Sequence, residues 1–167
     1  MPALPDYTPS LERTLVMSTS SSRAVRLHRV LKAPPEKVYR AFLNADALAR
    51  WLPPYGFLCK VQHLEAKVGG TFKMSFHNFS TGNGHSFGGE YLELVPNERL
   101  RYTDKFDDPN LPGLITVDVQ LKAVSCGTEL NVVQDGIPQV IPLEMCYLGW
   151  QESLAQLAQL VEPDIPE

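Results

Sequence analysis

Histidines, cysteines and serines are the side chains of this sequence that could perform catalysis or bind a metal. His77 and His85 could meet across one hairpin, but two metal ligands without a third make a poor site, and His28 and His63 do not complete the spacing. No serine lies in a nucleophile-elbow motif, no spacing signals a Cys–His pair, and the sequence has no glycine-rich phosphate loop. The sequence therefore predicts no catalytic residue set, no metal site and no cofactor.

Glu90 is a carboxylate that could face either an interior pocket or water. Counting along a strand with a period of two places it on the same face as Leu92 and Leu94, toward the interior. There it would need an arginine, a tyrosine hydroxyl or a bound proton to offset its lost hydration. A bulge at Gly88-Gly89 would instead reverse the parity and place Glu90 in water, so both alternatives stay open.

Two further polar side chains have a strand parity that favours the interior. Asp104 shares a face with Tyr102, but we expect it in solvent because it lies near the end of its strand. His63 has the parity of inward-facing neighbours, and we expect a surface position or a satisfied hydrogen bond for it. The cysteines are odd in number and widely spaced, so we expect buried reduced thiols at Cys59, Cys126 and Cys146.

The overall composition is that of one globular domain with short tails. The 167 residues are 44% hydrophobic and 20% charged, ordinary values for a single domain. The formal charge of −4 argues against a nucleic-acid or anionic-membrane partner, since both bind basic patches. No apolar run reaches the length of about 18 residues that a membrane span needs, so we expect no membrane insertion. The N-terminus lacks the pattern of a signal peptide, and we expect a cytoplasmic protein.

The elements that must position these side chains are two short helices, six or seven strands and one long helix. Pro34-Pro35 starts the first short helix, and Asp46 is the predicted N-cap of the second, which runs through Trp51. The long helix follows Pro142, with apolar residues at steps of three or four up to Val161. The predicted strands span residues 24–31, 57–64, 71–79, 86–95, 100–105, 114–124 and 129–134.

This order predicts an α+β helix-grip fold, in which a curved antiparallel sheet of six or seven strands wraps around the long C-terminal helix. A curved sheet and a straight helix cannot fill all the space between them, so we expect a pocket there. Trp51 and Trp150 are candidates for the wall of this pocket, and the alternative is that both simply pack in the hydrophobic core. Gly149 costs the helix about 1 kcal/mol relative to alanine, which a close approach of backbone or ligand would justify. The predicted ligand-binding residues are Trp51, Phe72, Met74, Phe76, Glu90, Tyr102, Val117, Val119, Cys146 and Trp150.

Four segments in unbroken order carry a resemblance to a known family over roughly residues 24 to 161. They read VLKAPPEKVYRAFLNADALARWL, EAKVGGTFKMSF, FGGEYLELVPNERLRYTDKF and GWQESLAQLAQLV. The sequence resembles the homologues of the heat-shock protein 90 ATPase activator, within the START-like and Bet v 1-like superfamily. The resemblance implies a helix-grip fold with a cavity between the sheet and the C-terminal helix. The sequence departs from the family at Pro53-Pro54, where members often carry a Trp-Gly-Pro-like stretch, so the resemblance does not define the shape of the pocket mouth.

Three functions are compatible with this sequence. The first is the binding of a small apolar or aromatic molecule, such as a lipid or a polyketide-like metabolite. The second is an enzyme of the cyclase, aromatase or hydrolase type, which would use Glu90, His63 or Tyr102 as acid or base. The third, suggested by the resemblance, is a stress-response chaperone partner that stimulates an ATPase. It ranks third because 167 residues leave no room for the separate N-terminal domain with which the eukaryotic activators engage their partner.

Short tails flank the predicted domain of residues 23–162. Residues 1–22 combine three prolines with a Ser/Thr run and cannot bury much surface, so we expect a mobile tail there. Within it, Met17 is an alternative natural start to Met1. Residues 163–167 form the C-terminal tail.

A variant that begins at Ser18 should therefore unfold within a few degrees of the full chain. In a domain of this size, the loss of about 1 kcal/mol lowers Tm by only about 2–4 °C. Thermal unfolding followed by circular dichroism measures the difference. A fall of more than about 10 °C would show that the segment is a structural part of the domain.

Overall fold

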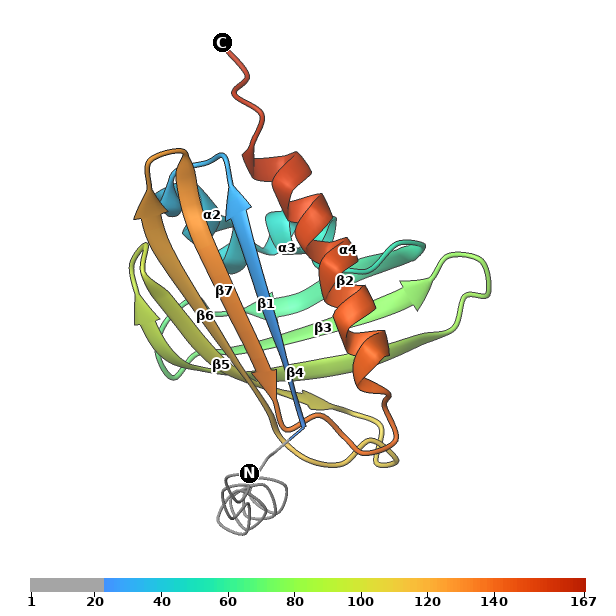
Figure 1. The fold of residues 1–167 in the computed structure, drawn as a ribbon. Coiled ribbons are helices and arrows are strands. Elements are labelled where there is room, and N and C mark those ends of the chain that lie inside the picture. Colours follow the sequence, from blue (N-terminus) through green and yellow to red (C-terminus); the bar gives the residue numbers. More distant parts are fainter. Residues whose placement is uncertain (1–22) are drawn as a thin grey trace, which may run out of the picture.

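Alternating apolar and polar residues form seven strands, which pair into one antiparallel sheet in the order β1-β7-β6-β5-β4-β3-β2 (Figure 1). The computed structural model describes residues 23–167, so the expectations for residues 1–22, with Met17 as a possible start, concern a segment outside the described residues. The predicted strands are confirmed with small differences at their ends. They are β1 (Ala24–Leu31), β2 (Phe57–Leu64), β3 (Thr71–Asn78), β4 (Gly84–Val95), β5 (Arg99–Phe106), β6 (Ile115–Val124) and β7 (Gly127–Asp135).

The described residues contain three helices, α2 (Pro35–Leu43), α3 (Ala45–Trp51) and α4 (Leu143–Val161). Proline opens or precedes α2 and α4, where its fixed φ suits a helix start and its missing N–H costs no hydrogen bond. The prediction of Asp46 as the cap of α3 is wrong. The side chain of Asn44 accepts a hydrogen bond from the Ala47 backbone N–H at 2.9 Å, while Asp46 lies in the first turn of the helix.

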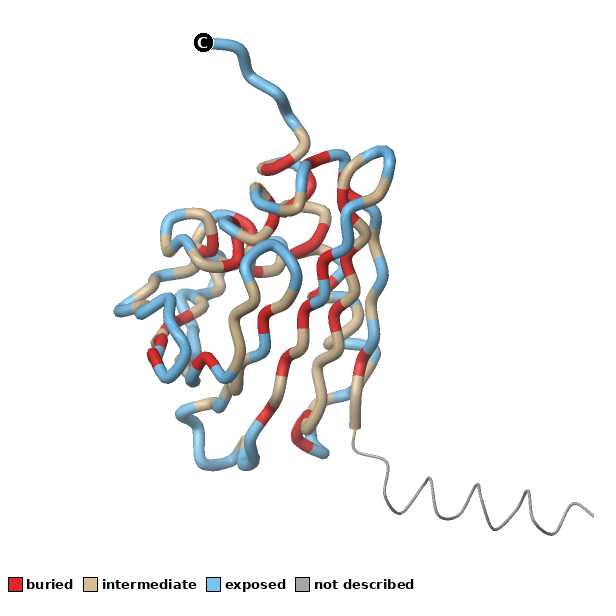
Figure 2. Tube along the Cα trace, turned by 90° about the vertical axis from the view of Figure 1, so that its left-hand side faces the viewer, coloured by how far each residue is buried: buried red, intermediate tan, exposed pale blue. Residues whose placement is uncertain are grey.

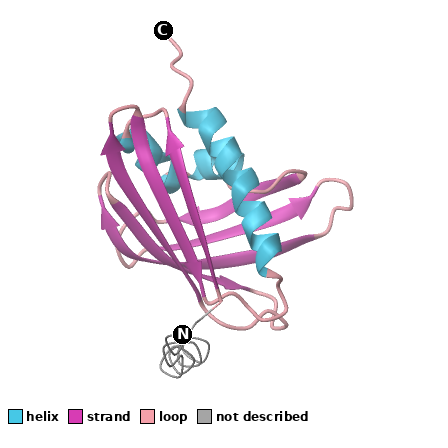
Figure 3. Cartoon of the chain, in the orientation of Figure 1, coloured by secondary structure: helices cyan, strands magenta, loops and turns pink. Residues whose placement is uncertain are grey.

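The long helix α4 crosses the curved sheet, and α2 and α3 lie beside its C-terminal half (Figure 3). The buried positions of α4 recur at steps of three and four, as the apolar pattern predicts. Along the strands, buried residues alternate with more exposed ones, so that one face of the sheet is packed and the other meets solvent (Figure 2). The predicted helix-grip fold is therefore confirmed.

Trp51 fixes the corner where the two short helices meet. Its side chain is fully buried, and its ring lies edge-on to Phe42 with centroids 4.8 Å apart. The indole Nε1–H donates to the backbone carbonyl of Ala41 at 2.9 Å, so the one polar atom of the ring is satisfied. This packing joins the last residue of α3 to α2 and gives α4 a rigid surface to rest on.

Side-chain hydrogen bonds hold α4 in place over the sheet. Ser153 Oγ donates to the Leu52 carbonyl at 2.6 Å, and Gln156 Nε2 donates to the Trp51 carbonyl at 3.1 Å. These carbonyls lie at the C-terminal end of α3, where helix carbonyls lack intrahelical partners. On the sheet side, Trp150 Nε1 donates to Gln134 Oε1 on β7 at 3.0 Å. Hydrogen bonds thus join the middle of α4 both to the end of α3 and to β7.

The bulge predicted at Gly88-Gly89 lies instead at Leu92, where β4 holds one residue more than β5 between paired positions. Gly89 has another reason to be glycine. A Cβ at this position would lie 1.8 Å from the backbone oxygen of Thr103. The close approach also lets the backbone N–H of Glu90 donate to Thr103 Oγ1 at 3.0 Å.

Gly89→Ala should therefore lower the free energy of unfolding by about 1–3 kcal/mol, because the added methyl group forces the backbone of β4 and β5 apart. Urea denaturation measures the change. The control is Gly149→Ala in α4, where an added Cβ has no atom within 4 Å, and which should stabilise the helix by about 1 kcal/mol. Equal effects of the two substitutions would contradict this account of Gly89.

Candidate functional site

A cavity of about 330 Å³ lies between the sheet and α4. The strands β3, β4 and β5 supply most of its floor. Period-two alternation turns every second side chain of each strand toward α4, and the antiparallel register brings these side chains together. The aromatic residues of the floor are Phe72, Phe76, Phe87, Tyr91, Tyr102 and Phe106.

These floor rings form two aromatic clusters, one of Phe72, Tyr91 and Tyr102 and one of Phe76, Phe87 and Phe106. Phe76 meets Phe87 edge-on with centroids 4.8 Å apart, and Phe72 meets Tyr102 edge-on at 5.7 Å. The rings of Tyr91 and Tyr102 lie 6.0 Å apart on neighbouring strands. Such edge-to-face contacts stabilise the rings in fixed orientations. The cavity floor is therefore a rigid apolar surface.

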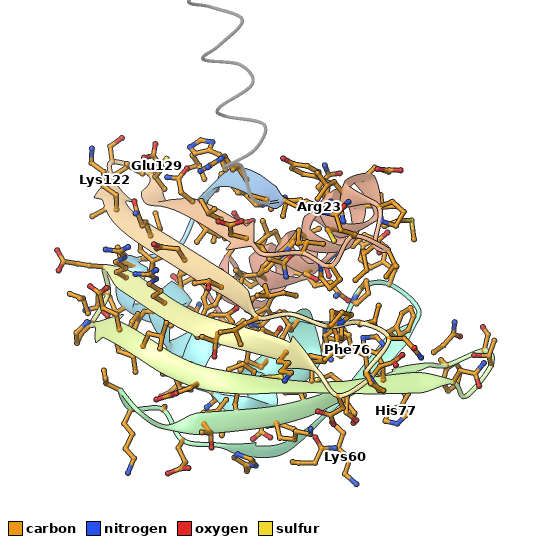
Figure 4. The ribbon with its side chains drawn as sticks, turned by 90° about the horizontal axis from the view of Figure 1, so that it is seen from below. Arg23, Lys60, Phe76, His77, Lys122 and Glu129 are labelled. Carbon is orange, nitrogen blue, oxygen red and sulfur yellow. The ribbon has the colours of Figure 1, made fainter. Side chains whose placement is uncertain are left out.

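The opposite wall comes from α4 and the loop before it. The α4 side chains Met145, Cys146 and Trp150 line the cavity, and Gly149 leaves a gap between them. Arg23 holds the loop by donating to the carbonyls of Pro138 and, at 2.7 Å, Ile141. In Figure 4, Phe76 lies on the side of the sheet that faces α4, Arg23 lies near the start of α4, and His77 and Lys60 lie on the opposite side of the sheet.

Seven of the ten residues predicted to bind ligand line this cavity. They are Phe72, Met74, Phe76, Tyr102, Val117, Cys146 and Trp150. Their role as ligand contacts stays a prediction, whereas their convergence on one cavity is a property of the structure. Of the two reasons expected for Gly149, a close approach of backbone or of ligand, the first is wrong, since no atom lies within 4 Å of an added Cβ, and the second stays a prediction.

The other three predicted residues lie elsewhere. Trp51 and Val119 are fully buried in the core, and Trp51 packs against Phe42 of α2. Glu90 is exposed, because the bulge at Leu92 separates its parity from that of Leu94, which packs on the core. The inward residues of β4 are instead Phe87 and Tyr91. Period-two counting from Phe87 predicts them, provided that it stops before the bulge.

His63 also lies outside the cavity. A second bulge, between Val61 and His63 in β2, reverses the parity, and the exposed His63 ring contacts Thr71 Oγ1 at 3.0 Å. The expectation of buried thiols is wrong for Cys126, which is exposed, and Cys59 is half-buried. Among residues 23–167, no three histidine, cysteine or acidic side chains gather closely enough to hold a metal ion.

Asp104 carries the one carboxyl group among the described residues that line the cavity, and the expectation that it lies in solvent is wrong. The strand β5 continues to Phe106, and β6 pairs Ile115 with Asp104, so this residue is not at a frayed end. The residue keeps some accessible surface, but its Oδ1 has almost none and finds no hydrogen-bond partner within residues 23–167. Burial raises the pKa of Asp104 to about 7, against a smaller lowering by the backbone amide of Lys105.

The remaining titratable groups of the cavity are neutral near pH 7. Burial, with a contribution from His77, lowers the pKa of His85, whose ring lies 5.7 Å from that of Phe76. Burial raises the pKa of Tyr91 and, with the nearby Asp104 carboxyl, that of Tyr102, so both hydroxyls stay protonated. Sequence reasoning missed His85 as a lining residue, although its cross-strand pairing with the inward Phe76 is the signal that places it there.

The sequence profile described as Activator of Hsp90 ATPase homolog 1-like protein matches residues 32–162. The chain belongs to this family. It is 62% identical to a protein from Chromobacterium violaceum of known crystal structure, with a TM-score of 0.84, and the match covers 84% of this chain and 98% of the other. A search of curated proteins gives no significant match.

Two solved structures with lower sequence identity share the fold of this chain. A crystal structure of a protein from Rhodobacter sphaeroides is 21% identical, with a TM-score of 0.73 over 84% of this chain and 92% of the other. The solution structure of an AHSA1-like protein from Aeromonas hydrophila is 22% identical, with a TM-score of 0.69 over the same shares of the two chains. Within the described range, no helix has both the length and the apolar character needed to cross a membrane.

In this family member, Trp150→Ala should change both stability and ligand affinity, because Trp150 packs on the core and also lines the cavity. Loss of the indole should cost about 3–5 kcal/mol if the ring is fully packed, and less to the extent that it borders empty space. Leu157→Ala is the control. This fully buried residue of α4 lies away from the cavity, and its truncation should cost about 2–5 kcal/mol without altering ligand affinity.

Unfolding and ligand titration on both variants separate the two roles. An unchanged affinity in Trp150→Ala, together with lost stability, would show that Trp150 is ordinary core.

Asp104 should make the native state less stable as the pH rises. An aspartate of the unfolded chain titrates near pH 4, whereas Asp104 in the folded protein has a pKa of about 7, so between these values the folded state binds more protons. The free energy of unfolding therefore falls from about pH 4 to about pH 7 through this group. The measurement is the difference in unfolding free energy between Asp104→Asn and the wild type, which should grow over this range. Parallel pH profiles would contradict the assignment.

Proposed function

We propose that this protein binds a small apolar or aromatic molecule, such as a lipid or a polyketide-like metabolite, in the cavity beneath α4. The observation that carries the proposal is an aromatic-lined pocket of about 330 Å³ between the sheet and α4, which opens to solvent near the exposed Met145. Protein interiors are close-packed, and voids larger than a water molecule are few. A space of this size falls in the range of ligand pockets, and few polar groups converge on it.

The walls suit a ligand with an apolar body. Burial of apolar surface contributes about 25 cal/mol per Å², and a small molecule that fills the cavity would cover ring faces on its floor and side chains of α4 at once. The edge-to-face contacts within each of the two ring clusters keep these rings in place before a ligand arrives, so that little side-chain entropy is lost on binding.

Acid–base catalysis is the second candidate, and Asp104 is the observation that favours it. A carboxyl group with a pKa near 7 suits a general base at neutral pH. The residues that the sequence suggested for this role, Glu90 and His63, do not line the cavity, and burial keeps the Tyr102 hydroxyl protonated. Binding therefore ranks first, and catalysis would have to use Asp104.

The neutral fluorescent probe Nile red should bind the native protein saturably and be displaced by apolar or aromatic compounds. In Gly149→Leu, the new side chain should enter the cavity and weaken probe binding about tenfold or more, a change of about 1.4 kcal/mol. The control is Gln151→Leu, which adds the same side chain to the exposed face of α4 and should leave binding unchanged. No saturable binding to the wild type, or equal binding by all three proteins, would refute the proposal.

A further inference from the structure

The Asp104 carboxyl is a polar group for which the folded chain supplies little compensation. Its Oδ1 is buried and has no hydrogen-bond partner within the described part of the chain. A buried acceptor without a partner loses its hydration and gains nothing in return. The folded protein already bears this cost at Oδ1, so a donor that a ligand brings to this oxygen displaces no water from it.

Aromatic rings surround the same part of the cavity. Tyr102 precedes Asp104 by two residues on the inner face of β5, and Phe106 follows it by two. Tyr91 lies beside Tyr102 on β4, with ring centroids 6.0 Å apart. The faces of such rings attract organic cations, most strongly in sites shielded from water. An ammonium group can donate a hydrogen bond to a carboxylate and lie against aromatic ring faces, so a site with both groups can recognise it.

The lining offers no positive charge that could compete for this carboxyl group. Within residues 23–167, no lysine or arginine lines the cavity. The histidine of the lining, His85, is an exposed residue whose pKa is lowered by partial burial of its ring and by the nearby His77, which favours its neutral form. Arg23 lies near Cys146, but its guanidinium donates to the carbonyls of Pro138 and Ile141. An anionic ligand would therefore meet Asp104 without a cation to balance it.

We propose that the cavity prefers an amphipathic amine, a molecule with an apolar or aromatic body and a protonated amino group that pairs with Asp104. This inference rests on the proposed binding function and specifies its ligand class. The apolar body occupies the space between the aromatic floor and α4. The ammonium group donates to the Asp104 carboxylate and lies against the faces of the neighbouring tyrosine rings.

Three probes that differ only in their head group test the inference: 4-phenylbutylamine, 4-phenylbutanol and 4-phenylbutanoate, titrated by calorimetry at pH 7.5. The wild type should bind the amine about tenfold or more tightly than the alcohol, as a hydrogen bond to a charged group warrants, and the carboxylate most weakly. Asp104→Asn should abolish the preference for the amine while the affinity for the alcohol changes less than about threefold. Glu90→Gln removes the same charge from an exposed position and should behave as the wild type.

The outcomes separate this inference from the proposed function. Equal binding of amine and alcohol by the wild type would overturn the preference for amines, as would an amine preference that persists in Asp104→Asn, and either would leave the binding function standing. Failure of all three probes and of Nile red to bind the wild type would overturn the binding function and this inference with it. The comparison of probes on the wild type does not depend on the folding of any variant.

Discussion

The hydrogen bonds at the middle of α4 keep the helix at a fixed position over a curved sheet, and the cavity depends on them. Ser153 and Gln156 bind the free carbonyls at the end of α3, while Trp150 binds Gln134 on β7. A straight helix held in this way cannot follow the curvature of the sheet. The C-terminal half of α4 therefore packs against the short helices joined by Trp51, and the space beside Gly149 stays open.

The chemistry of the space follows from what the sheet presents to it. Neighbouring antiparallel strands place aromatic residues side by side, and their edge-to-face contacts give the floor a shape that exists before binding. Within this apolar surface, Asp104 is held without a full set of partners, and burial shifts its pKa toward neutrality. The shape of the cavity thus follows from the strand register, whereas its polarity comes from the single side chain of Asp104.

The fold could be predicted from the sequence because its signals are local and repeated. Alternation along β6 and the three-four spacing along α4 each extend over many residues, and both are confirmed. The cavity was predicted less completely, because parity is lost at a bulge. The strand parity of Glu90 left two orientations open, and the extra residue in β4, Leu92, separates the outward Glu90 from Leu94; the position of such a bulge depends on pairing with β5. Asp104 was misplaced for a related reason, since β5 continues beyond its last pair with β6, Asp104–Ile115, by pairing Lys105 and Phe106 with β4.

The chain contains two tryptophans, and their indole N–H signals in a heteronuclear NMR spectrum provide the most direct measurement of whether ligands enter this cavity. Trp150 lines the space, whereas Trp51 is fully buried beside α2. Titration with Nile red, with the two signals assigned through Trp150→Phe, should shift the Trp150 signal saturably and leave that of Trp51 in place. Saturable binding that shifts only the Trp51 signal, or neither signal, would contradict a binding site between the sheet and α4.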